Sequence, residues 1–288
     1  MHPAVLAALV CPHDGQGLQQ DARSLACAAG HRFDLARQGY ATLIRRPLAH
    51  SGDPAPMIER RLRVHGADLL GAVHTAVVAA ARAAALPPGI VCDLGAGPGT
   101  YLAAVLDARE DRAGLAIDVS KAAARRAARC HQRAASIVAD VWDGLPVATG
   151  SVALLLDVFA PRPAEELARV VAPGGTLLVV TPLPDHLAEL RGPFDLLDVA
   201  EDKAASLPDR LGPAFTEVAR DRVEDVVEVR ASQAADLAGM GPSGHHLDVG
   251  ALEAAARELP AASEVRVAVT LSRFVRREVR GGAGSLTR

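Results

Sequence analysis

The chain has 288 residues, which is enough for one large domain or for two domains. Half of the residues are apolar but only 3% are aromatic, so alanine, valine and leucine have to build the core. The formal net charge of -3 neither requires nor excludes a polyanionic partner. No apolar run reaches the roughly 18 residues that a membrane-spanning helix needs, so we expect no membrane partner.

The four cysteines, at positions 11, 27, 92 and 130, do not form the framework of a disulfide-rich secreted protein. The apolar N-terminus lacks the basic segment of a signal peptide. Both observations favour a reducing, cytoplasmic location.

Charged residues are unevenly distributed along the chain. Basic residues concentrate in residues 37–63, 119–139 and 266–288, and acidic residues in 184–236. The basic clusters are either ordinary solvated faces or parts of an RNA-binding surface.

Residues 1–44 are predicted to form a small N-terminal module. Cys11, Cys27 and His31 stand at the spacing of a zinc ribbon, and Asp14 stands where the second ligand is expected. A carboxylate oxygen can bind Zn²⁺, and His13 is adjacent, so either residue could complete the set. The alternative is a metal-free hairpin.

Residues 45–85 are predicted to form a Pro- and Gly-rich linker followed by one or two alanine-rich helices. Asp53 and Pro54 have the residue types of an N-cap and a first helical position. Arg60, Arg61 and Arg63 would oppose the helix dipole unless an anionic group faces them. They serve either solubility or RNA contact.

From residue 86 to 280 strands and helices alternate, which indicates a parallel α/β sheet. The predicted strands cover residues 90–94, 114–117, 136–139, 152–156 and 176–180, with helices at 121–130 and 165–171. Beyond them we expect a strand or hairpin at 215–229, helices at 232–238 and 249–258, a last strand at 265–275 and a disordered tail at 281–288.

The stretch after the first strand is the clearest binding motif. Asp93 is followed by Gly95, Gly97 and Gly99, and the next residues have helical spacing. Such a turn lets the backbone approach a ligand that carries phosphate, ribose or carboxylate. Because the third glycine comes one residue earlier than in G-x-G-x-x-G, the spacing argues against a dinucleotide. A glycine-rich turn that binds nothing is the alternative.

Two further positions are predicted to line a cofactor crevice beside this glycine-rich turn. Asp118 ends the second strand, 19 residues after Gly99, where an acid reaches ribose hydroxyls in such folds. The segment after the fourth strand lies across the crevice, and Asp157 there could accept a proton or simply end the strand.

The glycine spacing resembles the first motif of S-adenosylmethionine (AdoMet) dependent methyltransferases with a Rossmann-like core. The resemblance implies that AdoMet contacts the loop, Asp118 and the segment that brackets adenine. These residues are Asp93, Gly95, Ala96, Gly97, Gly99, Thr100, Tyr101, Asp118, Asp140 and Val141.

The order of Cys27, His31, Phe33, Asp34, Ala36, Gly39 and Tyr40 resembles the N-terminal zinc module of the RlmA/TlrB family of 23S rRNA (guanine-N1)-methyltransferases. The resemblance extends over roughly residues 9–275, and it is greatest to the branch that confers resistance to tylosin-like macrolides. In that family three Cys and one His hold Zn²⁺, so Asp14 is a departure.

The resemblance implies an α/β fold, a Rossmann-like class I methyltransferase with a zinc-ribbon-like module, acting as a homodimer on a 23S rRNA hairpin. The family has a similar Phe-Ala-Pro segment after the fourth strand and a Met-x-Pro segment near residue 240. We therefore expect catalytic roles for Asp157 and Phe159, and substrate contacts from Pro161, Arg162, Met240, Pro242, His245 and His246. The two histidines are either base contacts or metal ligands. A small-molecule methyltransferase and a non-catalytic RNA-binding protein of the same fold are the alternatives.

Overall fold

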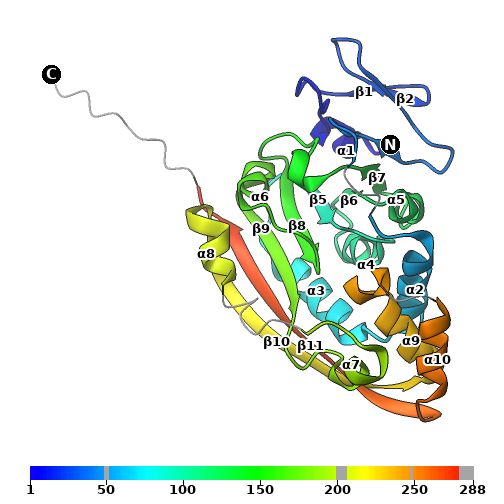
Figure 1. Cartoon of the computed structure of the whole chain (residues 1–288). Helices are drawn as coiled ribbons and strands as arrows, with labels where there is room; N and C mark the ends of the chain where they lie inside the picture. The colour runs from blue at the N-terminus through cyan, green and yellow to red at the C-terminus, as the bar shows by residue number, and fades with distance from the viewer. Residues whose placement is uncertain (49–51, 199–205, 247–248, 279–288) are drawn as a thin grey trace.

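The computed structural model describes residues 1–48, 52–198, 206–246 and 249–278. Its main element is an eight-stranded sheet with the order β10-β11-β9-β8-β5-β6-β7-β4 (Figure 1). The strands are β4 (Ala41–Thr42), β5 (Ile90–Leu94), β6 (Gly114–Asp118), β7 (Ala134–Val138), β8 (Val152–Val158), β9 (Val171–Pro182), β10 (Phe215–Arg230) and β11 (Ala262–Arg276).

The direction in which the chain adds strands reverses at β5. From β5 the chain continues outward to β6 and β7, then returns to the other side of β5 with β8 and β9, all in parallel. β11 is antiparallel to both β9 and β10. In open α/β sheets ligands bind outside the carboxyl ends of the strands at such a reversal, between β5 and β8 here.

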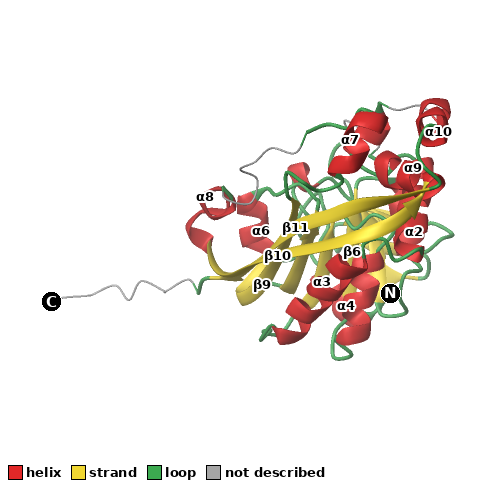
Figure 2. Cartoon of the chain, turned by 90° about the horizontal axis from the view of Figure 1, so that it is seen from below, coloured by secondary structure: helices red, strands yellow, loops and turns green. Residues whose placement is uncertain are grey.

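Helices cover both faces of the sheet (Figure 2). One face packs against α2 (Ala55–Gly66), α3 (Gly71–Ala83), α4 (Thr100–Ala108), α7 (Ala188–Phe194), α9 (Ala231–Gly239) and α10 (Val249–Arg257). The other packs against α1 (Pro3–Ala8), α6 (Ala164–Val170) and α8 (Leu207–Leu211). Strand β8 is buried along its whole length, with Leu154 and Leu156 in one core and Leu155 in the other.

Shorter elements complete the chain. They are α5 (Lys121–Ala127), which packs on β6 and β7, and the 3-10 turns η1 (Val141–Asp143), η2 (Gly212–Ala214) and η3 (Pro242–His245).

The N-terminal module is a three-stranded antiparallel sheet of β1 (Gln19–Asp21), β2 (Ser24–Ala26) and β3 (Arg32–Asp34), seen in blue in Figure 1. It does not have a core of its own, because Leu25 and Cys27 are buried in the same cluster as Ile90 of the main sheet. The next strand, β4, already pairs with β7. The segment predicted to end the module at residue 44 is therefore part of the main sheet.

The structure confirms some of the expected elements and departs from others. The first long helix begins at Ala55 with Pro54 as N-cap, because the Asp53 side chain pairs with Arg61 and His245 instead of capping. Residues 215–230 form one strand, which is the first of the two forms expected there. The strand expected at residues 176–180 is longer, because β9 begins at Val171 and ends at Pro182. The tail expected at residues 281–288 lies outside the described residues.

In the part of the chain that the structure describes, no single helix is long and apolar enough to cross a membrane. Helices α2 and α3 together would be long and apolar enough, but they are bent by 81° where they meet.

Candidate cofactor crevice and metal centre

The glycine loop connects the end of β5 to the first turn of α4. Gly95 has φ +65°, and a Cβ there would lie 2.8 Å from the Cβ of Ala160 in the turn after β8. An L-residue at this position would be strained and would also collide with that turn. Glycine therefore lets two strand ends approach each other closely at the sheet reversal.

Asp118, at the end of β6, lies against the glycine loop. Its Oδ2 accepts a hydrogen bond from the Gly97 N–H at 2.9 Å, and its Oδ1 accepts one from the Ser120 N–H at 2.8 Å. Burial raises the pKa of this carboxyl. The structure thus brings Asp118 to the loop, as a ribose-binding acid requires.

Asp93 lies beneath the loop and is 2% exposed. Burial raises its pKa to about 8, and among the described residues its Oδ2 has no hydrogen-bond partner. The buried hydroxyl of Tyr101, in the first turn of α4, also lacks one within the described part of the chain. Unpaired buried polar atoms beside a glycine loop are typical of a ligand site.

Asp140 and Val141 follow β7 at the same end of the sheet. The Asp140 Oδ1 accepts a hydrogen bond from the Trp142 N–H at 2.9 Å and so caps η1. Val141 packs against the second core. Asp140 therefore fixes the turn that the sequence assigns to the adenine end of the crevice.

The turn after β8 presents Phe159 at the surface. Phe159 has φ +56°, its side chain is 43% exposed, and its ring centroid lies 5.9 Å from that of His186. A bulky residue with positive φ is an outlier that the surroundings have to stabilise. Pro161 in the same turn is exposed.

Asp157 and Arg162 hold that turn. The Arg162 Nη1 donates to the Asp157 Oδ1 at 2.7 Å, and the Ala160 N–H donates to the same carboxylate. Burial raises the pKa of Asp157 to about 7. Because its carboxylate has 0% exposure, it does not contact a substrate in this conformation. The geometry favours the strand-ending role of Asp157 over proton acceptance.

The arginines of α2 have anionic partners within the chain. Asp236 of α9 accepts from the Arg60 Nη1 at 3.0 Å and from the Arg63 Nη2 at 2.6 Å. Arg61 pairs with Asp53 and donates through Nε to the Met240 carbonyl oxygen at 3.1 Å.

This pairing brings part of the predicted substrate segment to the loop. The His245 Nε2 lies 2.7 Å from the Asp53 Oδ1, and Met240 is held by Arg61. Pro242 and His246, on and just after η3, are exposed. The sequence did not identify Asp53, Arg61 and Ser120 as neighbours of the glycine loop. The one available signal was the group of arginines at the start of a helix, which predicted that an anionic group lies nearby.

The four predicted metal ligands form one cluster. Each of Cys11, Asp14, Cys27 and His31 offers one ligand atom, and these atoms all lie within 4.8 Å of one another. The His31 Nδ1 is 3.1 Å from the Asp14 Oδ2 and 3.4 Å from the Cys27 Sγ. The Gln16 N–H donates to the other oxygen of Asp14 at 2.9 Å, which leaves Oδ2 toward the cluster.

Comparison with known proteins adds relatives along almost the whole chain. A family model described as RlmA, N-terminal, a zinc ribbon, matches residues 9–48. A 23S rRNA (guanine(748)-N(1))-methyltransferase of Streptomyces fradiae is 42% identical over 94% of this chain and 98% of its own length. A putative 23S rRNA (guanine-N(1)-)-methyltransferase of Micromonospora griseorubida is 42% identical over 95% of this chain and 99% of its own.

The chain belongs to the 23S rRNA (guanine-N1)-methyltransferase family. The predicted family and fold class are thereby confirmed. Among solved structures, a geranyl diphosphate methyltransferase in complex with GPP and sinefungin covers 72% of this chain and 78% of its own, with a TM-score of 0.46 and 14% identity.

The crevice of this family member suits AdoMet. The glycine loop offers a close backbone approach, Asp118 offers acceptors for hydroxyl groups, and the buried Oδ2 of Asp93 has no partner among the described residues and is open to a hydrogen bond from a ligand.

The metal cluster suits a zinc ion. With Zn–S distances of about 2.3 Å and Zn–N or Zn–O distances of about 2.0 Å, neighbouring ligand atoms of a tetrahedral site are about 3.3 to 3.8 Å apart. The Cys27 Sγ lies 3.2 Å from the Asp14 Oδ2, and the Cys11 Sγ lies 3.5 Å from the His31 Nδ1. The donor set therefore needs only small movements to close on the ion.

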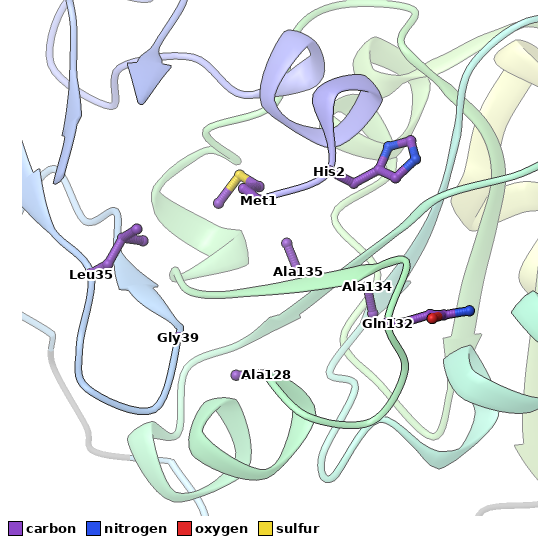
Figure 3. A pocket seen from close by; sticks show the side chains of 8 residues that line it. All are labelled: Met1, His2, Leu35, Gly39, Ala128, Gln132, Ala134 and Ala135. Carbon is purple, nitrogen blue, oxygen red and sulfur yellow. The ribbon is translucent and has the colours of Figure 1, made fainter. Parts of the chain in front are cut away.

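A separate cavity of about 400 Å³ lies where the module meets the main sheet (Figure 3). It is lined by Met1, His2, Leu35, Gly39, Ala128, Gln132, Ala134 and Ala135. None of these lining residues belongs to the predicted cofactor, substrate or metal set. The cavity is therefore distinct from the crevice at the glycine loop.

Proposed function

We propose that this chain transfers a methyl group from AdoMet to N1 of a guanine in a hairpin loop of 23S rRNA. The observation that carries the proposal is 42% identity over 94% of the chain to an enzyme named for that reaction. The glycine loop at the sheet reversal supports it independently.

AdoMet, when bound, would supply an electrophilic methyl group on its sulfonium. Transfer breaks the S–CH3 bond and forms the N1–CH3 bond, and it releases S-adenosylhomocysteine and the N1 proton, which passes to solvent water. The chain then has to bind AdoMet and the guanine, align N1 with the methyl group, and exclude water from the site. In this proposal the loop from Asp93 to Tyr101 binds the methionine and ribose end, Asp118 accepts the ribose hydroxyls, and Asp140 with Val141 borders the adenine.

Phe159 is proposed to stack on the target guanine. A base in a hairpin has to be unstacked before its N1 is reachable, and aromatic side chains commonly receive such bases. An aromatic ring that is 43% exposed beside the glycine loop, on a backbone with φ +56°, suits that role. Asp157 and Arg162 are then positioning residues, because their ion pair holds the turn that presents Phe159.

The surrounding RNA is proposed to contact Pro161, Met240, Pro242, His245 and His246 at the mouth of the crevice, and the N-terminal module beyond it. Zn²⁺ held by Cys11, Asp14, Cys27 and His31 would fix the loops of that module. We propose residues 1–44 as the module, residues 45–85 as the connecting segment and residues 86–280 as the catalytic domain. The module and the catalytic domain share one apolar core.

Three wider proposals concern location, resistance and oligomeric state. We propose that the chain acts in the cytoplasm, where ribosomal RNA is found. Its methylation of 23S rRNA would protect ribosomes from tylosin-like macrolides. Minimum inhibitory concentrations in a sensitive host, with and without the gene, measure this effect. The proposed homodimer is checked by light scattering on the purified chain.

The deciding experiment incubates the protein with labelled AdoMet and 23S rRNA hairpins, then maps modified nucleotides by mass spectrometry. N1-methylguanine is the expected product. Transfer to small metabolites without transfer to RNA would refute the proposal.

Phe159→Ala tests the stacking role within the same assay. Loss of one base–aromatic stack is worth about 1 to 3 kcal/mol, so single-turnover methylation below saturating RNA should fall about 5- to 160-fold. Val226→Ala is the matched control, because Val226 is also exposed, at 51%, but lies on β10. Equal rates for the two variants would remove Phe159 from the site.

A further inference from the structure

Arg61 crosses the glycine loop from α2 with its side chain 23% exposed. The Nη1 atom lies 3.5 Å from the point that a Cβ on Gly97 would occupy, directly over the loop. Asp118, which accepts the Gly97 N–H, is close enough that the positive charge of Arg61 favours its ionised form. The guanidinium therefore borders the crevice at the loop and the ribose-binding acid.

Two of the three guanidinium nitrogens are already occupied by the protein. Nε donates to the Met240 carbonyl oxygen at 3.1 Å, and Nη2 pairs with Asp53. Asp53 is itself fixed, because His245 lies 2.7 Å from its Oδ1 and the Ser120 hydroxyl donates to its backbone carbonyl at 2.6 Å. The planar fork of Arg61 is thus held in one orientation before any ligand arrives.

The third nitrogen, Nη1, has no acceptor among the residues that the structure describes. Nε and Nη2 of the guanidinium are held by the protein, and the two N–H donors of Nη1 remain beside the binding loop. This arrangement is preorganised for an anionic ligand group. Of the groups that AdoMet carries, only the carboxylate of its methionine end has a negative charge. We infer that Arg61 binds that carboxylate through Nη1, an assignment that rests on the proposed use of AdoMet.

An RNA phosphate is the other anion that could reach Nη1. The position favours the carboxylate, since Nη1 lies against Gly97 and the guanidinium is covered by Met240 on its Nε side. A backbone phosphate is bulky and would have to enter between these two elements. The choice between the two anions is left to the measurement.

The test is calorimetric titration of the full chain with S-adenosylhomocysteine and with 5′-methylthioadenosine, which has no amino-acid end. A charged hydrogen bond of this kind contributes about 10- to 100-fold in affinity. For Arg61→Met we expect a loss of that size with S-adenosylhomocysteine and less than a twofold change with methylthioadenosine. Arg61→Lys should recover part of the affinity, because the charge is retained.

Each other outcome has a distinct meaning. Equal losses for both ligands would show that Arg61 only shapes the crevice, and would overturn the assignment. Unchanged nucleoside binding with weaker binding of a 23S rRNA hairpin would identify a phosphate contact, and would also overturn it. If the unaltered chain bound neither nucleoside, the proposed function would fail first and the Arg61 assignment with it. Thermal melting of each variant confirms that it is folded.

Discussion

Gly95→Ala tests the close approach between the glycine loop and the turn after β8. The new residue would adopt φ +65°, which costs about 1 to 2 kcal/mol in the left-handed region. Its Cβ would also lie 2.8 Å from that of Ala160, a contact that forces a backbone shift. Overpacking of this kind typically adds about 1 to 3 kcal/mol. We expect a total loss of about 2 to 5 kcal/mol in the free energy of unfolding.

Gly174→Ala separates the two contributions. Gly174 has a similar φ of +73°, but a Cβ there meets nothing within 4 Å. Denaturant unfolding of both variants should therefore show about 1 to 2 kcal/mol for Gly174→Ala and a clearly larger loss for Gly95→Ala. Gly174→Ala should also still bind S-adenosylhomocysteine, whereas Gly95→Ala should not. Equal losses with unchanged binding would refute the proposed steric contact.

Three further predictions concern the metal, pH and an ion pair. Asp14→Cys should retain zinc longer than the natural chain against a chelator and Asp14→Ala should lose it sooner, as elemental analysis after dialysis would show, because thiolate is the softer and stronger ligand. Burial lowers the pKa of His65 to about 3, so the neutral fold loses stability as the pH falls below the unfolded value of 6.5. Between pH 6.5 and 5 the free energy of unfolding, measured with denaturant, should fall by about 2 kcal/mol less in His65→Leu than in the natural chain. The same pH dependence in both proteins would contradict this reasoning. Asp236→Asn leaves Arg60 and Arg63 without their carboxylate and should cost about 3 kcal/mol, whereas Glu253→Gln, at an exposed pair 3.6 Å long, should cost less than about 1 kcal/mol in the same assay.

Local sequence signals located the main elements of the crevice. The apolar run at 90–94 is strand β5, and the alternate glycines after it all have positive φ. These features depend on neighbouring residues, so a local pattern can reveal them. The parallel sheet is predicted by the same kind of pattern, whereas the order of the strands within it is known only from the structure.

Contacts between distant segments could not be predicted in this way. Arg63 and Asp236 are 173 residues apart, and nothing near Arg63 in the sequence identifies its partner. Asp53 has the residue type of an N-cap, but its carboxylate is engaged by Arg61 and His245. A long-range ion pair thus replaced the local role that the sequence favoured.

The shared core links the metal centre to the crevice. Cys11 and Cys27 are buried in the same apolar cluster as Ile90 and Leu94, the ends of strand β5 that precedes the glycine loop. An ion that holds both thiolates would therefore stabilise one side of this cluster and not only a peripheral hairpin. Because the module shares this core, loss of the ion should loosen the packing beneath β5 as well as the loops of the module.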